Sequence, residues 1–225
     1  MLFPDMLHQG VKGIPLKTCK ASQSEEQFNL DKSKLNLPSR LETDRLVIRK
    51  YERSDGKALF DLFERNDNRE LLKEQVDEAA DIKTVKDAET DLGRHIEEWD
   101  SRERFVMGFW LKGSDTYIGQ IWIEPRSWDV PSFELGYYLD TGYLGQGLAT
   151  EAAARSVEFI FKELTAHKAI IITHDTNERS WKVAERLGFK REGHHRESGI
   201  KEGKRYGLYH YGLLRSEYTM KDSEG

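Results

Sequence analysis

The segment YLGQGLATEA, residues 143–152, constrains the fold of this chain more than any other stretch. Gly145 and Gly147 flank Gln146, residues 133–140 before them read as a strand, and an amphipathic helical run follows. The apolar face of that run is formed by Ala149, Ala153, Val157 and Phe161. A strand, a glycine turn and a helix start predict a phosphate cradle, because glycine lets the backbone approach an anion and the first helical turn offers unpaired N–H groups.

The same pattern also fits an ordinary tight turn, and two familiar phosphate motifs are absent. A Walker loop needs Lys followed by Ser or Thr after its last glycine. A dinucleotide-binding fingerprint needs a third glycine where this chain has Thr150. The turn alone therefore leaves the ligand open.

Composition narrows the class of protein. A length of 225 residues allows one large domain, or one domain with an extension. The net charge of −5 disfavours non-specific nucleic-acid binding and suits a cationic partner such as an amine. Cys19 is the only cysteine, and the seven histidines show no ligand spacing, so no disulfide and no metal site are expected. Because no apolar run could span a membrane and the start lacks a signal-peptide core, we expect a soluble, cytoplasmic protein without membrane partners.

The order of the predicted elements indicates a mixed α/β fold. Residues 1–40 read as an extension to which no chemistry is assigned, residues 41–220 as the domain, and residues 221–225 as a tail. Strands are expected at 44–51, 104–111, 117–124, 133–139, 167–173, 190–196 and 206–214, and helices at 54–63, 84–99, after the glycine turn and at 176–187. This order requires both antiparallel and parallel strand pairs.

Local signals fix several helix ends. Thr84 and Asp87 make a capping box at the start of one helix. Gly188 ends another at the position where a left-handed residue is favoured. Residues 66–80 are charged and less regular, and no element is expected there.

Three stretches together resemble the GNAT superfamily of N-acetyltransferases: TDRLVIR at 43–49, FELGYYLDTGYLGQGLATEA at 133–152 and NERSWKVAERLGF at 177–189. The chain is most similar to the branch that includes the ribosomal-protein N-terminal acetyltransferases, from about residue 42 to 218. The resemblance implies a strongly twisted mixed sheet flanked by helices. Two central parallel strands, 133–140 and 167–173, would splay apart to admit acetyl-CoA.

The resemblance also implies how acetyl-CoA is held. The pyrophosphate would lie on the glycine turn and the pantetheine arm beside residues 137–139, where a backbone group would polarise the acetyl carbonyl. Leu144 stands where the family has Gln or Arg, which removes a side-chain contact but leaves the backbone donors. The residues implied to bind acetyl-CoA are Tyr137, Tyr138, Leu139, Gly145, Gln146, Gly147, Leu148, Ala149, Thr150, Asn177 and Lys182.

Two side chains are candidates for catalysis. Strand alternation puts Glu134, Gly136 and Tyr138 on one face, which we expect to face the cleft, so Glu134 is the candidate base; a solvated strand glutamate is the alternative. The tyrosine that many family members use as an acid is replaced by Ala184, and the resemblance implies Ser180, in the pattern Asn177-x-x-Ser180, instead. The same pair also fits a helix cap without catalysis.

The acceptor pocket is expected between residues 66–99 and the hairpin 196–211. Trp122, Tyr137, Tyr138 and Tyr206 would wall it, or else pack in the core. Gly207 replaces an aspartate common in relatives, and Glu197 or Glu202 could supply the charge.

These features predict a monomeric or homodimeric enzyme that moves acetyl from acetyl-CoA to a primary amine, most simply a protein N-terminus. The alternatives are a small-molecule amine (a polyamine, amino sugar or aminoglycoside) as acceptor, or a non-catalytic acyl-CoA-binding module.

Overall fold

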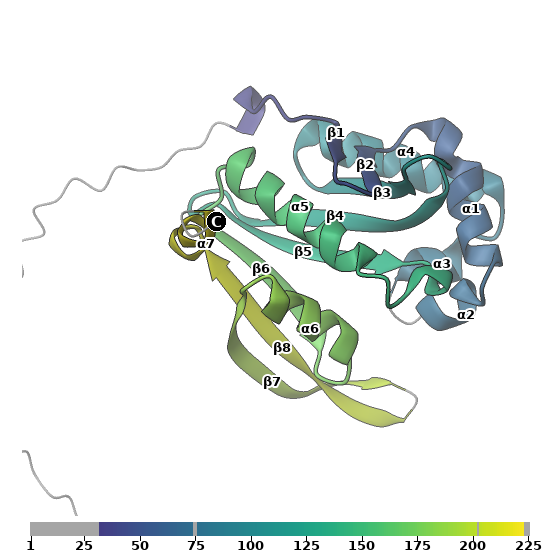
Figure 1. Ribbon diagram of the computed structural model, residues 1–225. Helices are drawn as coiled ribbons and strands as arrows, with labels where there is room; N and C mark the ends of the chain where they lie inside the picture. The colour runs from purple at the N-terminus through teal and green to yellow at the C-terminus, as the bar shows by residue number, and fades with distance from the viewer. Residues whose placement is uncertain (1–31, 74–75, 202, 223–225) are drawn as a thin grey trace, which may run out of the picture.

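An eight-stranded sheet runs through the computed structural model, which describes residues 32–73, 76–201 and 203–222 (Figure 1). The strands are β1 (Arg40–Glu42), β2 (Leu46–Lys50), β3 (Phe105–Leu111), β4 (Tyr117–Ser127), β5 (Ser132–Leu139), β6 (Lys168–His174), β7 (Lys190–Lys201) and β8 (Lys204–Leu214). Their order is β1-β2-β3-β4-β5-β6-β8-β7. Within the described ranges β5 and β6 are the parallel pair, and the other neighbours are antiparallel. The predicted mixed fold is confirmed.

The two parallel strands separate soon after they begin. β5 pairs with β6 at three positions, Ser132 with Lys168, Phe133 with Ala169 and Glu134 with Ile170. Beyond Glu134, β5 stays paired with β4, and β6 stays paired with β8. Figure 1 shows the sheet opening here into two halves. The expected splay is therefore present, and the facing edges of both strands have no ladder between them past this point.

Helices cover both faces of the sheet. They are α1 (Gly56–Glu64), α2 (Asn68–Leu72), α3 (Asp77–Asp81), α4 (Val85–Ser101), α5 (Leu148–Lys162), α6 (Glu178–Arg186) and α7 (Arg215–Asp222). One core lies under α5 and α6, and a second lies between the sheet and α1–α4. Phe105 and Met107 enter the first core and Val106 the second. Strand β3 is therefore apolar almost throughout, because both of its faces are buried.

The local helix signals hold. The Thr84–Asp87 capping box opens α4 with both reciprocal hydrogen bonds. Gly188 follows α6 with a φ of 87°, a value in the left-handed region that favours glycine. Among the described residues, no helix is both long and apolar enough to cross a membrane.

Several elements differ from the sequence-based expectation. Residues 66–80 contain the short helices α2 and α3, and β1 and α7 were not predicted. Strand β4 continues to Ser127, and β7 to Lys201, where loops were expected. Each of these segments is short, charged or edge-placed, so local pattern is weak and pairing with distant chain decides its structure.

Tyr138 lies on the strand face that alternation predicts, but the expectation that its side chain walls the acceptor pocket is wrong. Its side chain does not wall an acceptor pocket but is 3% exposed in the second core. Its ring lies 6.0 Å from that of Phe63, and its hydroxyl lies 3.3 Å from that of Tyr117. The face opposite the first core is covered by helices at this position rather than open to a cleft.

Candidate active site

The glycine turn after β5 has the geometry of an anion cradle. Gly145 and Gly147 have φ angles of 78° and 79°, in the region that only glycine enters at low cost. Gly147 is the N-cap of α5, and the first backbone hydrogen bond of this helix runs from Glu151 N–H to Gly147 O at 3.0 Å. The N–H groups of residues 148–150 therefore precede the internal bonding of the helix and are available to an anion.

Contacts from the first strand fix the shape of this turn. The Arg45 guanidinium donates to Gln146 O at 3.0 Å and pairs with the Glu151 carboxylate at 2.6 Å. Thr43 Oγ1 donates to the same carboxylate at 2.5 Å. Gln146 is thus held through its backbone, with its side chain exposed.

A cavity of about 590 Å³ opens along the turn, on the side where β5 and β6 separate. This volume is within the usual range for cofactor sites. The residues on its walls that were predicted to bind acetyl-CoA are Tyr137, Tyr138, Leu139, Gly145, Gly147, Leu148, Ala149, Thr150, Asn177 and Lys182. Ser180, the candidate catalytic residue, also lies on these walls. Of the predicted donor set, Gln146 is outside these walls. The structure brings the other members together from β5, α5 and α6.

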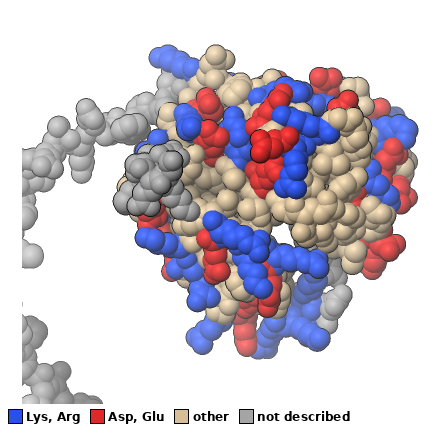
Figure 2. Space-filling view, viewed as in Figure 1, with Lys and Arg blue, Asp and Glu red and all other residues tan. Residues whose placement is uncertain are grey.

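Basic side chains line the α6 side of this cavity. Arg179, Lys182 and Arg186 lie on its walls, and Figure 2 shows Lys and Arg side chains gathered in the lower half of the molecule, where Figure 1 places α6. Lys182 also forms an ion pair with Glu178 at 2.7 Å. Sequence reasoning singled out Lys182 alone. The spacing of three and four residues along one helix face is the signal that would have added Arg179 and Arg186.

A second cavity of about 390 Å³ lies on the other side of the split. Its walls include Val76, Trp122, Gly136 and His174. It shares Tyr137, Asn177 and Ser180 with the first cavity. Molecules bound in the two cavities would therefore meet at these three side chains, which form the junction of the cavities.

Tyr137 and Ser180 are the polar groups at this junction. The Asn177 side chain caps α6 by accepting from Ser180 N–H at 3.2 Å, which fixes the first turn of the helix. The Tyr137 hydroxyl is buried and has no hydrogen-bond partner among the described residues. Burial raises the pKa of Tyr137, and the neighbouring Ser180 hydroxyl works in the opposite direction. Both hydroxyls remain protonated donors at neutral pH.

Glu134 lies at the closed end of the split. Its carboxylate forms an ion pair with the Arg126 guanidinium at 2.5 Å, and its side chain is 16% exposed. Among the described residues that line the two cavities, Glu134 does not occur. A proton taken up by Glu134 would have to reach it from the junction through other groups.

His174 is a candidate base that sequence reasoning passed over. It is the last residue of β6, lines the second cavity and stacks on Tyr206 with a centroid distance of 3.8 Å. Burial, together with the positive charge of Lys201, lowers the pKa of His174. The imidazole is therefore neutral at neutral pH and able to accept a proton.

Asp175 supplies a carboxylate beside Gly207. A Cβ atom at Gly207 would lie 2.6 Å from Asp175 Oδ2 and 2.4 Å from His194 Nε2, so the His194–Asp175 pair excludes any side chain there. The two partners are 2.9 Å apart. Glu197, one of the two residues expected to supply a negative charge in place of an aspartate at position 207, instead pairs with Arg205 at 2.7 Å. The other, Glu202, lies outside the described residues.

Comparison with known proteins agrees with this geometry. The acetyltransferase (GNAT) domain family matches residues 45–190. The uncharacterized N-acetyltransferase YnaD of Bacillus subtilis is 27% identical over 79% of this chain and 98% of its own length. The uS5-alanine N-acetyltransferase of Escherichia coli is 27% identical over 71% of this chain and 82% of its own length.

Solved structures show the same fold. The ribosomal L7/L12 α-N-protein acetyltransferase RimL, in complex with coenzyme A, superposes with a TM-score of 0.70 at 16% identity, covering 80% of this chain and 98% of its own. A chimeric spermidine N-acetyltransferase from Vibrio cholerae superposes with a TM-score of 0.64 at 20% identity, covering 77% of this chain and 98% of its own. With the family match over more than half of its length, the chain belongs to the GNAT family and is an acetyl-CoA-dependent N-acetyltransferase.

Proposed function

We propose that this enzyme acetylates a protein N-terminal amine by direct attack on acetyl-CoA in a ternary complex. The observation that carries the proposal is the shared wall of the two cavities at Tyr137, Asn177 and Ser180. Two substrates that enter from opposite sides of the split sheet meet there without passing through a covalent enzyme intermediate. The E. coli relative named for the uS5 alanine supports a protein acceptor.

The donor cavity suits acetyl-CoA in its charge and in its shape. Amide groups of residues 148–150 would bind the pyrophosphate, and Arg179, Lys182 and Arg186 offer positive charge along the same wall. The thioester would reach the junction beside the free edge of β5, where backbone groups of residues 137–139 polarise its carbonyl.

Ser180 is proposed to stabilise the leaving thiolate. Its position in the first turn of α6 puts its hydroxyl at the junction, beside the otherwise unpartnered Tyr137 hydroxyl. Two hydroxyl donors next to developing negative charge lower the barrier by hydrogen bonding even if neither transfers its proton completely.

For removal of the amine proton, Glu134 and His174 are the two candidates. Glu134 has the carboxylate expected from sequence but is paired with Arg126. His174 lines the acceptor cavity and is held neutral, which supports it as the nearer base. A bell-shaped or rising pH–rate profile that flattens in His174→Gln but not in Glu134→Gln would assign the role to His174.

A polyamine is the second candidate acceptor. The fold similarity to a spermidine N-acetyltransferase favours it, and the net negative charge suits a polycation. The two candidates differ in one respect that is easily measured, since a peptide acceptor is acetylated at its α-amine and a polyamine at a terminal alkyl amine.

The test is thiol release from acetyl-CoA against N-terminal peptides, spermidine and an aminoglycoside, with mass spectrometry of the product. We expect peptide turnover to fall about 10²- to 10³-fold in Ser180→Ala, with little change in the KM for acetyl-CoA. Ser101→Ala, in the last turn of α4 outside both cavities, is the matched control and should keep full turnover. Turnover of spermidine alone would replace the peptide acceptor by a polyamine, and full activity in Ser180→Ala would remove Ser180 from the mechanism.

A further inference from the structure

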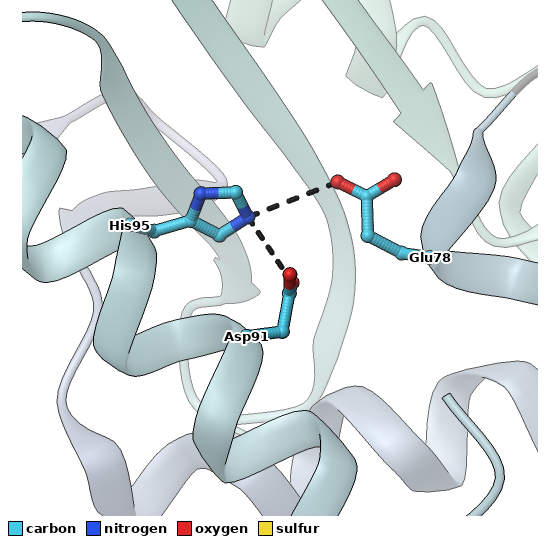
Figure 3. Close-up of side chains that lie close together, drawn as sticks. All are labelled: Glu78, Asp91 and His95. Carbon is cyan, nitrogen blue, oxygen red and sulfur yellow. Dashed lines mark ion pairs between the residues drawn. The ribbon is translucent and has the colours of Figure 1, made fainter. Parts of the chain in front are cut away.

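A buried histidine lies among acidic side chains between α3 and α4 (Figure 3). His95 and Asp91 lie one turn apart on α4, and Glu78 faces them from α3. His95 Nε2 is 3.2 Å from Asp91 Oδ2 and 3.7 Å from Glu78 Oε1. All three potential ligand atoms lie within 4.8 Å of one another.

The atoms that face the centre of this cluster are the ones without hydrogen bonds. His95 is 1% exposed, and its Nε2 has no hydrogen-bond partner among the described residues; the same holds for the buried Asp91 Oδ2. Buried polar atoms need a partner, so this cluster requires either a proton on His95 Nε2 that the two carboxylates share, or a ligand that accepts their electron pairs. The other oxygen of Asp91 is already used by Arg94 at 2.5 Å.

The two distances from His95 Nε2 match the spacing of metal ligands. Nitrogen and oxygen ligands at roughly 2.0–2.2 Å from a zinc ion stand about 3–4 Å apart. The two distances from His95 Nε2 fall in that range. On the far side of the ring, His95 Nδ1 lies 3.0 Å from Glu98 Oε2. A carboxylate that accepts a hydrogen bond from Nδ1–H fixes the tautomer whose Nε2 lone pair can bind the metal, which is the usual outer contact of a ligating histidine.

We propose that Glu78, Asp91 and His95 form a binding site for a divalent transition-metal ion, with Zn²⁺ as the ion best suited to one imidazole and two carboxylates. The two carboxylates balance the charge of the ion. Remaining coordination positions face a cavity of about 500 Å³ that is lined by Glu78 and Asp91. This cavity shares Val76 and Trp122 with the acceptor-side cavity, so the ion would tie α3 to α4 at the edge of the acceptor site.

The other charged side chains around the cluster allow a second role for it, without a metal ion. Asp77, Asp81 and Asp87 line the same cavity, as do the cations Arg94 and Arg104. A protonated His95 held between carboxylates is the other way to balance the cluster, as a purely structural group of ion pairs. The two roles differ in whether a stoichiometric metal ion binds.

The test uses the full chain after treatment with a chelator, titrated with Zn²⁺ by calorimetry and with Co²⁺ by visible absorption. We expect one Zn²⁺ per chain, much weaker binding of Mg²⁺, and a higher unfolding temperature when Zn²⁺ is present. Glu78→Gln should weaken Zn²⁺ binding at least tenfold and abolish the thermal shift. Glu98→Gln, which removes the outer contact, should weaken binding roughly 10- to 100-fold.

Asp81→Asn is the matched control, because it removes a carboxylate from the same cavity and the same helix but no atom of the cluster. It should bind Zn²⁺ like the wild type. Absence of stoichiometric Zn²⁺ binding by the wild type, or equal affinity in wild type and Glu78→Gln, would overturn the proposal. Circular dichroism of each variant separates lost binding from lost folding, and none of these readouts depends on acetyl transfer.

Discussion

Asp140→Asn tests whether the glycine turn, which we propose binds acetyl-CoA, is pre-formed by a buried carboxylate. Asp140 follows β5 directly, and its side chain has no solvent exposure. It accepts hydrogen bonds from Arg65 at 2.6 Å, from Asn66 at 2.9 Å and from Gly142 N–H at 3.0 Å. These contacts tie the loop after α1 to the start of the glycine turn.

These contacts determine how much folding free energy the Asp140→Asn substitution should remove. Breaking a buried ion pair by neutralising one partner typically costs about 3–5 kcal/mol. The Arg65 side chain is 33% exposed, so water stabilises part of the charge left behind. We therefore expect Asp140→Asn to lower the free energy of unfolding by roughly 2–4 kcal/mol at pH 7. Asp61→Asn, which breaks an exposed pair with Lys57, is the control and should change it by less than about 1 kcal/mol.

The pKa of Asp140 determines how the effect of Asp140→Asn on the free energy of unfolding changes with pH. Burial alone would raise the pKa of Asp140, but hydrogen bonds from Asn66, the Gly142 amide and Arg65 outweigh it and hold the pKa below its usual range. A carboxyl whose folded pKa is lowered stabilises the fold fully above its unfolded pKa of about 3.9, and loses that contribution as pH falls through the folded value. The difference between wild type and Asp140→Asn should therefore shrink as pH falls below about 4.

Urea unfolding of both proteins between pH 7 and pH 3, followed by circular dichroism, measures this difference. The KM for acetyl-CoA should rise in Asp140→Asn, because the turn loses its anchor at Gly142. A difference in unfolding free energy below about 1 kcal/mol at pH 7, or one of the same size at pH 3, would refute the reasoning.

Two further substitutions separate stability from binding. Gly147→Val and Gly113→Val both force a β-branched residue into positive φ, and each should lower the free energy of unfolding by about 1–2 kcal/mol. Only Gly147→Val should raise the KM for acetyl-CoA, by more than tenfold in steady-state assays, because Gly113 lies in the β3–β4 hairpin away from the cavity. Asn177→Ala should lower the free energy of unfolding by about 0.5–2 kcal/mol because α6 loses its cap, whereas Asn177→Ser should keep most of that stability; equal losses in urea titrations would contradict the capping role.

Short-range features were read correctly because neighbouring residues decide them. The Thr84–Asp87 box and Gly188 each complete their own hydrogen bonds or backbone turn within a few residues, so the sequence pattern is sufficient. The glycine turn is of the same kind, since glycine is the residue that adopts the positive φ observed at Gly145 and Gly147 at low cost. The splay of β5 from β6 was predicted from family resemblance and not from periodicity.

The surroundings of side chains that contact distant parts of the chain were predicted less accurately. Alternation placed Tyr138 correctly on the face opposite the first core, but only the packing of α1 and α4 buries it there. Glu134 lies where strand alternation puts it, yet its pairing with Arg126 follows from how β4 returns beside β5. His174 and Asp175 gain their roles from Tyr206, Gly207 and His194 across the last hairpin, contacts that no local pattern records.

Sequence alone thus determined the main strands and helices around the glycine turn, the capping box of α4 and the glycine that follows α6, because these depend on bonds between near neighbours. Tertiary structure decided which polar groups meet, including the junction at Tyr137 and Ser180 and the cluster around His95. The physical reason is that the burial and charge of a side chain are set by whatever long-range packing brings against it.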